Sequence, residues 1–143
     1  MLIQCSSCSR SNRVPATRVG DSAKCAACKA SLLPLHHPIA LGSSADFDEL
    51  VRDSPIPVLV DFWAAWCGPC RTVAPELAKL AGSRHGELVV AKVDTEALPD
   101  VAARFHITGI PTMILFRRGK ESTRLSGAMP ASAIAAKLGL AER

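Results

Sequence analysis

Six cysteines grouped into three C-x-x-C pairs restrict the fold of this 143-residue chain more than any other feature. The pairs are Cys5/Cys8, Cys25/Cys28 and Cys67/Cys70. Closely spaced cysteines form structural disulfides in oxidising compartments, whereas in reducing ones they bind metals or exchange electrons. The N-terminal sequence has no apolar region of the kind that a secretory signal needs. We therefore expect a cytoplasmic protein whose cysteines serve metal binding or redox chemistry.

The first two pairs have the spacing of a four-cysteine zinc site. Each is C-x2-C, and 16 residues separate them, which is within the range of ribbon-type sites that hold Zn2+ tetrahedrally. The predicted ligands are Cys5, Cys8, Cys25 and Cys28. One structural zinc ion would hold together a segment with almost no apolar core of its own. Two labile disulfides or a redox relay are the alternatives. His36 and His37 could replace a ligand, but four thiolates already complete the tetrahedron, so we expect linker histidines.

Prolines and composition divide the chain into two units. The proline-punctuated segment 33–38 cannot continue a helix and is predicted to link a zinc ribbon (1–32) to a larger domain (39–143). Hydrophobic residues make up 48% of the chain and charged residues 21%, as in globular proteins. No apolar run reaches the roughly 20 residues that a membrane helix needs.

The net charge of +4 is concentrated in the ribbon. Residues 1–32 contain five basic side chains and one acidic one, Asp21, whereas the remainder of the chain is neutral. A basic ribbon raises the possibility of nucleic acid binding. Four thiolates with one Zn2+ would lower its charge to about +2, and it has no aromatic residue to stack on bases. Nucleic acid is therefore disfavoured, and a solvated basic face or a protein-docking surface remains.

The larger domain alternates between apolar runs and amphipathic segments. Strands are predicted at 58–63, 88–93, 112–116 and, after a hairpin turn at 117–120, at 121–125; helices are predicted at 46–51, 69–84, 98–105 and 130–138. The run at 58–63 is apolar enough to be buried on both faces. This order predicts an α/β fold in which a central mixed sheet is flanked by helices on both faces.

The third cysteine pair lies where the strand at 58–63 passes into a helix. A thiol at a helix N-terminus faces the positive end of the helix dipole, which favours the thiolate. Cys67 is therefore predicted to be the exposed nucleophile. Cys70, one turn further on the same helix face, can close a disulfide with it. A pair of incidental core thiols, or half of a metal site, is the alternative.

Residues 58–70, VLVDFWAAWCGPC, resemble the active-site strand and loop of the thioredoxin family. The similarity continues through Val73-Ala74-Pro75, Lys92-Val93-Asp94 and Gly109–Thr112 to Gly127, and the head resembles the zinc ribbon of bacterial thioredoxin-2 proteins. Ala65 departs from the family, which often has a charged residue before the active-site Trp, and the chain contains no Tyr. The resemblance implies a thioredoxin fold preceded by a small zinc-ribbon domain.

Two charged residues near the cysteines acquire roles from this resemblance. Alternation places Asp61 on one face of its strand with Leu59 and Trp63, so burial should raise the pKa of its carboxyl. The resemblance implies that Asp61 is the base that deprotonates Cys70. It implies that Lys92 is the charge partner of Asp61, although a surface lysine is a strong alternative.

The resemblance also implies a substrate-docking surface around the cysteines. Its predicted residues are Trp66, Gly68, Pro69, Gly109, Ile110, Pro111 and Gly127. Most X–Pro bonds are trans, but the family has a cis-proline at the position of Pro111, facing the C-x-x-C pair. The cis bond would leave the backbone of Ile110 free to pair with an extended substrate segment. Gly127 could instead serve only as a turn residue.

Taken with the resemblance, these features predict a cytoplasmic protein-disulfide reductase. Cys67 would attack a substrate disulfide and Cys70 would resolve the mixed disulfide. The resemblance implies re-reduction by a flavin-containing, NADPH-dependent thioredoxin reductase, with no organic cofactor bound to the chain itself. The alternative is a binding module, either a zinc-ribbon adaptor or a redox-sensitive holdase chaperone on a thioredoxin scaffold.

Overall fold

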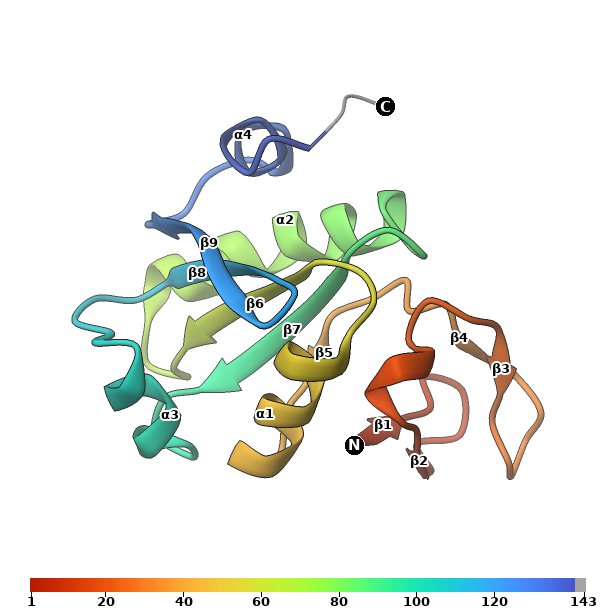
Figure 1. Cartoon of the computed structure of the whole chain (residues 1–143). Coiled ribbons are helices and arrows are strands. Elements are labelled where there is room, and N and C mark those ends of the chain that lie inside the picture. The colour runs from red at the N-terminus through yellow and green to blue at the C-terminus, as the bar shows by residue number, and fades with distance from the viewer. Residues whose placement is uncertain (141–143) are drawn as a thin grey trace.

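A five-stranded mixed sheet forms the centre of the larger domain in the computed structural model, which describes residues 1–140 (Figure 1). Its strand order is β5-β7-β6-β8-β9, with β5, β6 and β7 parallel and β8 and β9 antiparallel to their neighbours. The strands are β5 (Ile39–Ala40), β6 (Val58–Trp63), β7 (Val89–Asp94), β8 (Thr112–Arg117) and β9 (Lys120–Ser126).

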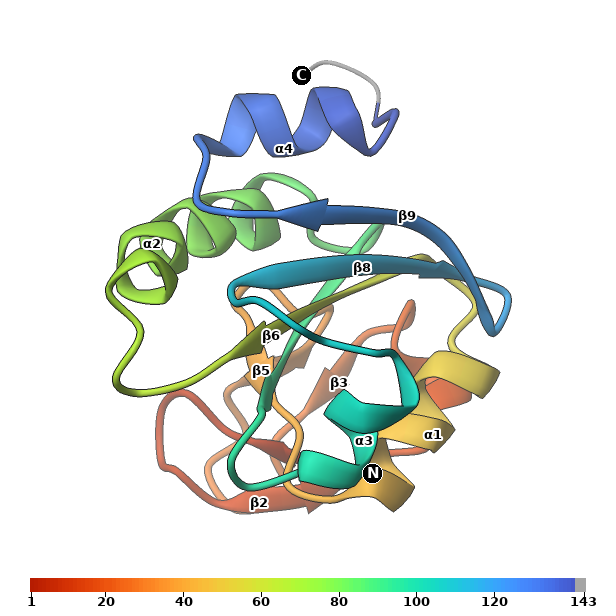
Figure 2. The same ribbon diagram turned by 90° about the vertical axis from the view of Figure 1, so that its left-hand side faces the viewer.

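Helices cover both faces of this sheet, as the sequence predicted. They are α1 (Ser44–Asp53), α2 (Gly68–Ser83), α3 (Pro99–Arg104) and α4 (Ala131–Lys137). In Figures 1 and 2, α2 and α4 lie on one side of the sheet and α1 and α3 on the other. Successive side chains of β6 point to opposite faces of the sheet and so contribute to a hydrophobic core on each face. Leu59 packs with α2 and α4, while Val60 and Phe62 pack with α1 and α3. Among residues 1–140, no helix is both long and apolar enough to cross a membrane.

The N-terminal segment folds as two small antiparallel hairpins. Their elements are β1 (Leu2–Gln4), β2 (Ser11–Arg13), the 3-10 helix η1 (Ala16–Arg18), β3 (Ala23–Lys24) and β4 (Ser31–Leu33). The two tight turns that carry the cysteine pairs repeat the same backbone geometry. The amide of Cys5 donates to the carbonyl of Arg10, and the amide of Cys25 to that of Ala30, at 2.9 and 2.8 Å.

The ribbon shares a hydrophobic core with the larger domain. Its buried side chains include Ile3, Val14 and Val19, and they belong to the same apolar cluster as Phe47 and Leu50 of α1. The ribbon was expected to have almost no core of its own, and its apolar side chains are buried instead in this shared cluster. The apolar residues of the ribbon are too few to form a core alone, but they complete one against α1. Leu33 and Leu35, which the sequence analysis assigned to the linker, are buried in the same cluster.

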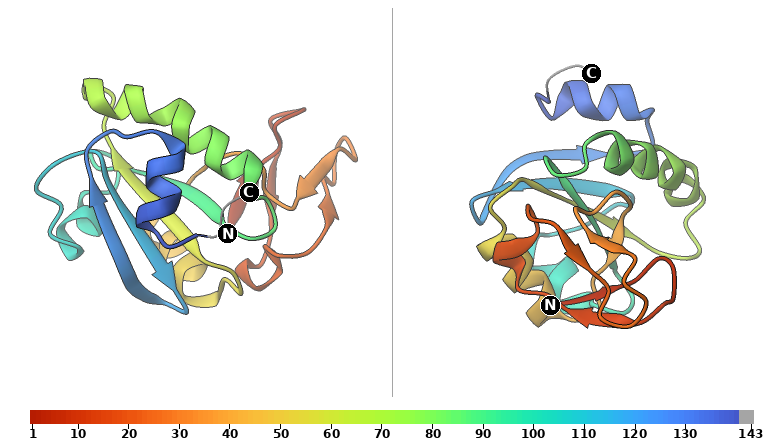
Figure 3. Two further views of the ribbon diagram at one scale, coloured as in Figure 1. Left: turned by 90° about the horizontal axis from the view of Figure 1, so that it is seen from above. Right: turned by 90° about the vertical axis from the view of Figure 1, so that its right-hand side faces the viewer.

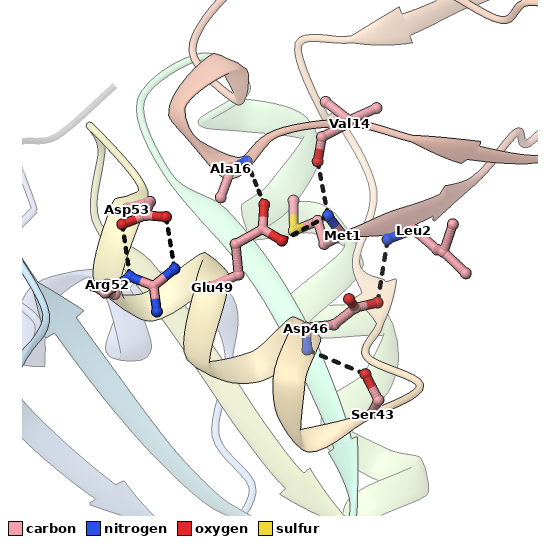
Figure 4. Close-up of polar contacts among 9 residues, drawn as sticks. All are labelled: Met1, Leu2, Val14, Ala16, Ser43, Asp46, Glu49, Arg52 and Asp53. Carbon is pink, nitrogen blue, oxygen red and sulfur yellow. Dashed lines mark hydrogen bonds and ion pairs between the residues drawn. The ribbon is translucent and has the colours of Figure 1, made fainter.

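Polar contacts fix the ribbon to α1 as well (Figure 4). Glu49 accepts hydrogen bonds from the Met1 ammonium through Oε1 (2.9 Å) and from the amide of Ala16 through Oε2 (2.8 Å). Asp46 accepts one from the amide of Leu2 (3.1 Å). Figures 1 and 3 show the ribbon on the opposite side of the molecule from the start of α2. The ribbon is thus held against α1, away from the helix end that carries the third cysteine pair.

Candidate redox site and metal centre

Cys67 and Cys70 form a disulfide at the start of α2. Cys67 is the N-cap residue, its Cα lies 5.3 Å from that of Cys70, and its sulfur accepts a hydrogen bond from the Cys70 amide at 3.2 Å. Pro69 occupies the first turn, where the missing N–H costs no helical hydrogen bond. The amide contact and the helix N-terminus both favour negative charge on Cys67 sulfur once the disulfide opens.

Both cysteines are covered in this disulfide form. Cys67 is 4% exposed and Cys70 is 3% exposed, so the expectation of an exposed Cys67 is wrong here. The physical reason is that its sulfur is bonded to Cys70 and lies 3.7 Å from the carbonyl oxygen of Ile110. The neighbouring Trp66, in contrast, is 67% exposed.

The loop before β8 faces the disulfide. The Ile110–Pro111 peptide bond is cis, as expected from the resemblance. The amide of Gly127 donates to the carbonyl of Pro111 at 3.0 Å, and Gly127 has a φ of +89°, a left-handed conformation that favours glycine. Added Cβ atoms at Gly68 and Gly109 would meet nothing within 4 Å. The predicted docking residues thus include an exposed indole and two glycines beside open space.

Trp66 has a partner that the sequence analysis did not identify. Its indole Nε1 donates to Oε1 of Glu96 at 2.7 Å, and the amide of Glu96 donates to Oδ1 of Asp94 at 2.9 Å. Thirty residues separate Trp66 from Glu96, and only the parallel pairing of β6 with β7 brings the ends of these strands together. The single clue in the sequence is an acidic cluster directly after an apolar strand.

Asp61 is fully buried in the middle of β6. Neither carboxylate oxygen has a hydrogen-bond partner among residues 1–140, and burial raises the pKa of this carboxyl to about 6, as the sequence predicted. Lys92 is paired opposite Asp61 on β7, and its charge opposes that rise. The Lys92 ammonium lies 4.7 Å from the centre of the Trp63 ring, a cation–π distance.

The four ribbon cysteines converge on one point. Their sulfur atoms all lie within 4.8 Å of one another, and the closest pairs are Cys5 with Cys28 at 3.7 Å and Cys8 with Cys25 at 3.6 Å. A tetrahedral Zn2+ with Zn–S bonds of about 2.3 Å requires S–S separations of about 3.8 Å. The thiols therefore fit a tetrahedral metal centre, with two ligands contributed by each hairpin.

Asn12 connects the two hairpins behind this cluster. Its Nδ2 donates to Cys25 sulfur at 3.5 Å and to the Arg10 carbonyl at 3.1 Å, while its Oδ1 accepts from the Ala26 amide at 3.0 Å. Hydrogen bonds to metal-ligating groups orient them and tune their charge. Asn12 was not among the predicted site residues, because a polar residue between hydrophilic neighbours carries no periodic signal.

A disulfide at the N-terminus of the helix that follows the central strand, facing a cis-proline loop, defines a thiol–disulfide oxidoreductase with a thioredoxin fold. The thioredoxin family model matches residues 38–139, and the model described as "Thioredoxin 2, N-terminal", a zinc ribbon, matches residues 4–30. The chain therefore belongs to the thioredoxin family and carries the N-terminal ribbon of the thioredoxin-2 type.

Relatives agree with this assignment over most of the chain. Thioredoxin C-3 of Corynebacterium nephridii is 42% identical over 129 residues, which cover 90% of this chain and 87% of that protein. Thioredoxin 1 of Chlorobaculum tepidum is 49% identical over 83 residues, 58% of this chain and 82% of that protein. The crystal structure of a Malassezia sympodialis thioredoxin superposes with a TM-score of 0.64 at 28% identity, covering 70% of this chain and 89% of that one.

Proposed function

We propose that the protein is a cytoplasmic protein-disulfide reductase that uses Cys67 and Cys70. The observation that carries this proposal is the Cys67–Cys70 disulfide at the start of α2, within contact of the Ile110 carbonyl. The metal centre proposed for the four ribbon cysteines needs them as thiolates and not as disulfides. Cysteines stay reduced in the cytosol, which supports the cytoplasm as the site of action.

The proposed reaction begins with the reduced pair. The Cys67 thiolate attacks one sulfur of a substrate disulfide, forming a mixed disulfide and releasing the other substrate sulfur as a thiolate. Cys70 then loses its proton to Asp61 and attacks Cys67 sulfur. This step releases the second substrate thiolate and leaves the Cys67–Cys70 disulfide. Two electrons have passed from the pair to the substrate, and Lys92 stabilises the ionised form of Asp61.

Substrate binding is proposed for the surface around the disulfide. Its residues are Trp66, Gly68, Pro69, Gly109, Ile110, Pro111 and Gly127. The exposed indole of Trp66 offers apolar area, and open space beside Gly68 and Gly109 allows the backbone of a substrate to approach closely. An extended substrate segment would pair with the backbone of Ile110.

Two partners complete the proposal. A Mycobacterium leprae relative named bifunctional thioredoxin reductase/thioredoxin is 46% identical over 92 residues, 64% of this chain and 20% of that protein. We infer that an NADPH-dependent, flavin-containing thioredoxin reductase re-reduces Cys67 and Cys70 here too. The thiol separations support one structural Zn2+ held by Cys5, Cys8, Cys25 and Cys28.

Insulin reduction with NADPH and a thioredoxin reductase tests this function. We expect multiple turnovers with the wild-type chain, no turnover with Cys67→Ser, and a trapped mixed disulfide with Cys70→Ser. Equal residual turnover in both variants, without a trapped species, would contradict the mechanism. Suppression of client aggregation without turnover would instead favour the holdase alternative.

A further inference from the structure

The ribbon carries a groove lined by cations. It has a volume of about 310 Å³, and residues of β2, β3 and their flanking segments form its walls. The basic side chains that line it are Arg10, Arg13, Arg18 and Lys24. All four are exposed residues, and along β2 the inward position between them is filled by Asn12, whose side chain contacts Cys25. Arg13 therefore lies on the exposed face of β2, while the buried side chains of Val14 and Leu32 also line the groove.

Little negative charge offsets these cations. Asp21 is the only acidic residue in the first 32, and it forms an exposed pair with Arg18 at 3.5 Å. Within the described residues 1–140, Arg10, Arg13 and Lys24 take part in no ion pair. Even with the charge of about −2 that four thiolates and Zn2+ would contribute, the ribbon stays positive, whereas the rest of the chain is neutral.

The two strands that contribute to the groove also have unpaired edges. In the described part of the chain, β2 pairs only with β1 and β3 only with β4, in two separate sheets. Each of these strands therefore has one edge without a strand partner, and such edges accept an extended peptide as an added strand. Two of the three unpaired cations, Arg13 and Lys24, lie on these same two strands.

We propose that this groove binds an extended, acidic segment of a partner protein. Guanidinium groups bind carboxylates in a bidentate manner, so Arg10, Arg13 and Arg18 suit alternating Asp or Glu side chains. The strand edges supply main-chain hydrogen bonds. Nucleic acid fits the groove less well, because the ribbon has no aromatic residue for stacking and carries only a small net charge. The groove goes beyond the proposed reductase activity and places a second docking surface away from the disulfide.

Binding of a labelled peptide to the full-length, zinc-loaded protein tests this proposal. The probe is a ten-residue peptide of alternating Glu and Val without cysteine, and its control replaces every Glu with Gln. We expect the Glu peptide to bind more tightly than the Gln peptide, and its affinity to fall as salt rises. The double variant Arg13→Gln/Lys24→Gln should weaken binding about five- to tenfold, because two exposed charge contacts are lost.

A matched variant separates the groove from net charge. Arg117→Gln/Lys120→Gln removes the same charge from exposed positions at the β8–β9 turn and should leave the peptide affinity unchanged. Reduction of a small-molecule disulfide should be unaffected in both variants, so a failure here is distinct from a failure of the reductase proposal. Absence of Glu-peptide binding, equal losses in the two double variants, or tighter binding of duplex DNA through the same four cations would overturn the inference.

Discussion

Asp61 and Lys92 occupy directly opposed positions on the parallel strands β6 and β7, yet no ion pair joins them within residues 1–140. The carboxylate is fully buried, while the Lys92 ammonium lies over the Trp63 ring. Lys92 therefore offsets only part of the cost of burying Asp61, and the pKa of that carboxyl stays raised at about 6. A carboxyl that titrates near 6 is suited to accept a proton from a thiol at neutral pH.

The first prediction concerns the rate of resolving the mixed disulfide in Asp61→Asn. The base acts only when ionised, so wild type should outperform the variant from about pH 6 upward, in the window set by its pKa of about 6. The raised pKa sets the lower pH limit of this defect near 6. At high pH, hydroxide deprotonates Cys70 and the defect should shrink. General-base assistance gives roughly 10²–10⁴-fold, and we expect the lower end. Stopped-flow measurement of the resolving rate across pH checks this prediction. A ratio of wild-type to variant rates that does not change with pH would refute it.

The second prediction concerns stability. The pKa of Asp61 is higher in the folded chain than its ordinary value of 3.8, so the folded state binds more protons between about pH 4 and 6, and stability falls as pH rises through this window. Ionising Asp61 should cost about 3 kcal/mol above pH 6. The free energy of unfolding of Asp61→Asn, relative to wild type, should therefore increase by about 2–3 kcal/mol between pH 4 and pH 8. Urea titrations at both pH values measure it, and a pH-independent difference would contradict the raised pKa.

The third prediction addresses the anchor of the ribbon. Both oxygens of Glu49 accept hydrogen bonds, whereas the Gln side chain has one acceptor oxygen and one donor amide. Glu49→Gln therefore either leaves the Ala16 amide unpaired or leaves the Met1 ammonium with only the Val14 carbonyl. We expect a loss of about 1–3 kcal/mol in the free energy of unfolding.

The stabilisation by Glu49 should depend on pH, and Asp48→Asn provides a matched control. The hydrogen bond from the Met1 ammonium holds the pKa of Glu49 below its ordinary value of 4.5. The stabilisation is thus present above pH 4.5 and is lost as pH falls through the lowered pKa. Asp48→Asn, on the same helix, breaks an ion pair with Arg104 that is about half exposed and should cost no more than about 1 kcal/mol. Equal losses in the free energy of unfolding of the two variants would show that Glu49 does not anchor the ribbon.

The fourth prediction concerns removal of the metal. A chelator should unfold the ribbon, because the free energy of binding the ion is part of what holds the two hairpins together. Since Ile3, Val14 and Val19 share a core with α1, the larger domain should remain folded but melt at a lower temperature. Insulin reduction at 25 °C should persist, because the ribbon lies on the opposite side of the molecule from the start of α2.

Metal analysis and calorimetry check this outcome. Cys67→Ser/Cys70→Ser should retain a full equivalent of zinc, whereas a truncated chain that begins at Leu35 should bind none. Zinc retained by the truncated chain would show that the division of roles between the two cysteine sets is wrong. A melting temperature identical to that of the full chain would contradict the shared core.

Most of the fold and much of the redox site could be predicted from local sequence patterns. The strands at 58–63 and 112–116 and the helix after Cys67 follow from apolar runs, turn residues and helix-start signals, all of which act over short distances in sequence. The cysteine spacings predicted the metal centre and the redox pair for the same reason, because the two cysteines of a C-x-x-C pair are close in sequence. The raised pKa of Asp61 was predictable too, because any carboxyl within an apolar strand is desolvated.

Tertiary structure alone decided the contacts that join distant segments. The Trp66–Glu96 hydrogen bond, the covering of Cys67 by Ile110, and the packing of the ribbon on α1 depend on which elements become neighbours. The ribbon appeared to lack a core because its apolar side chains occur in short runs among polar ones, with no long apolar period. Burial is a property of surfaces brought together by the whole chain, and these side chains find their partners only in Phe47, Leu50 and the rest of the shared cluster.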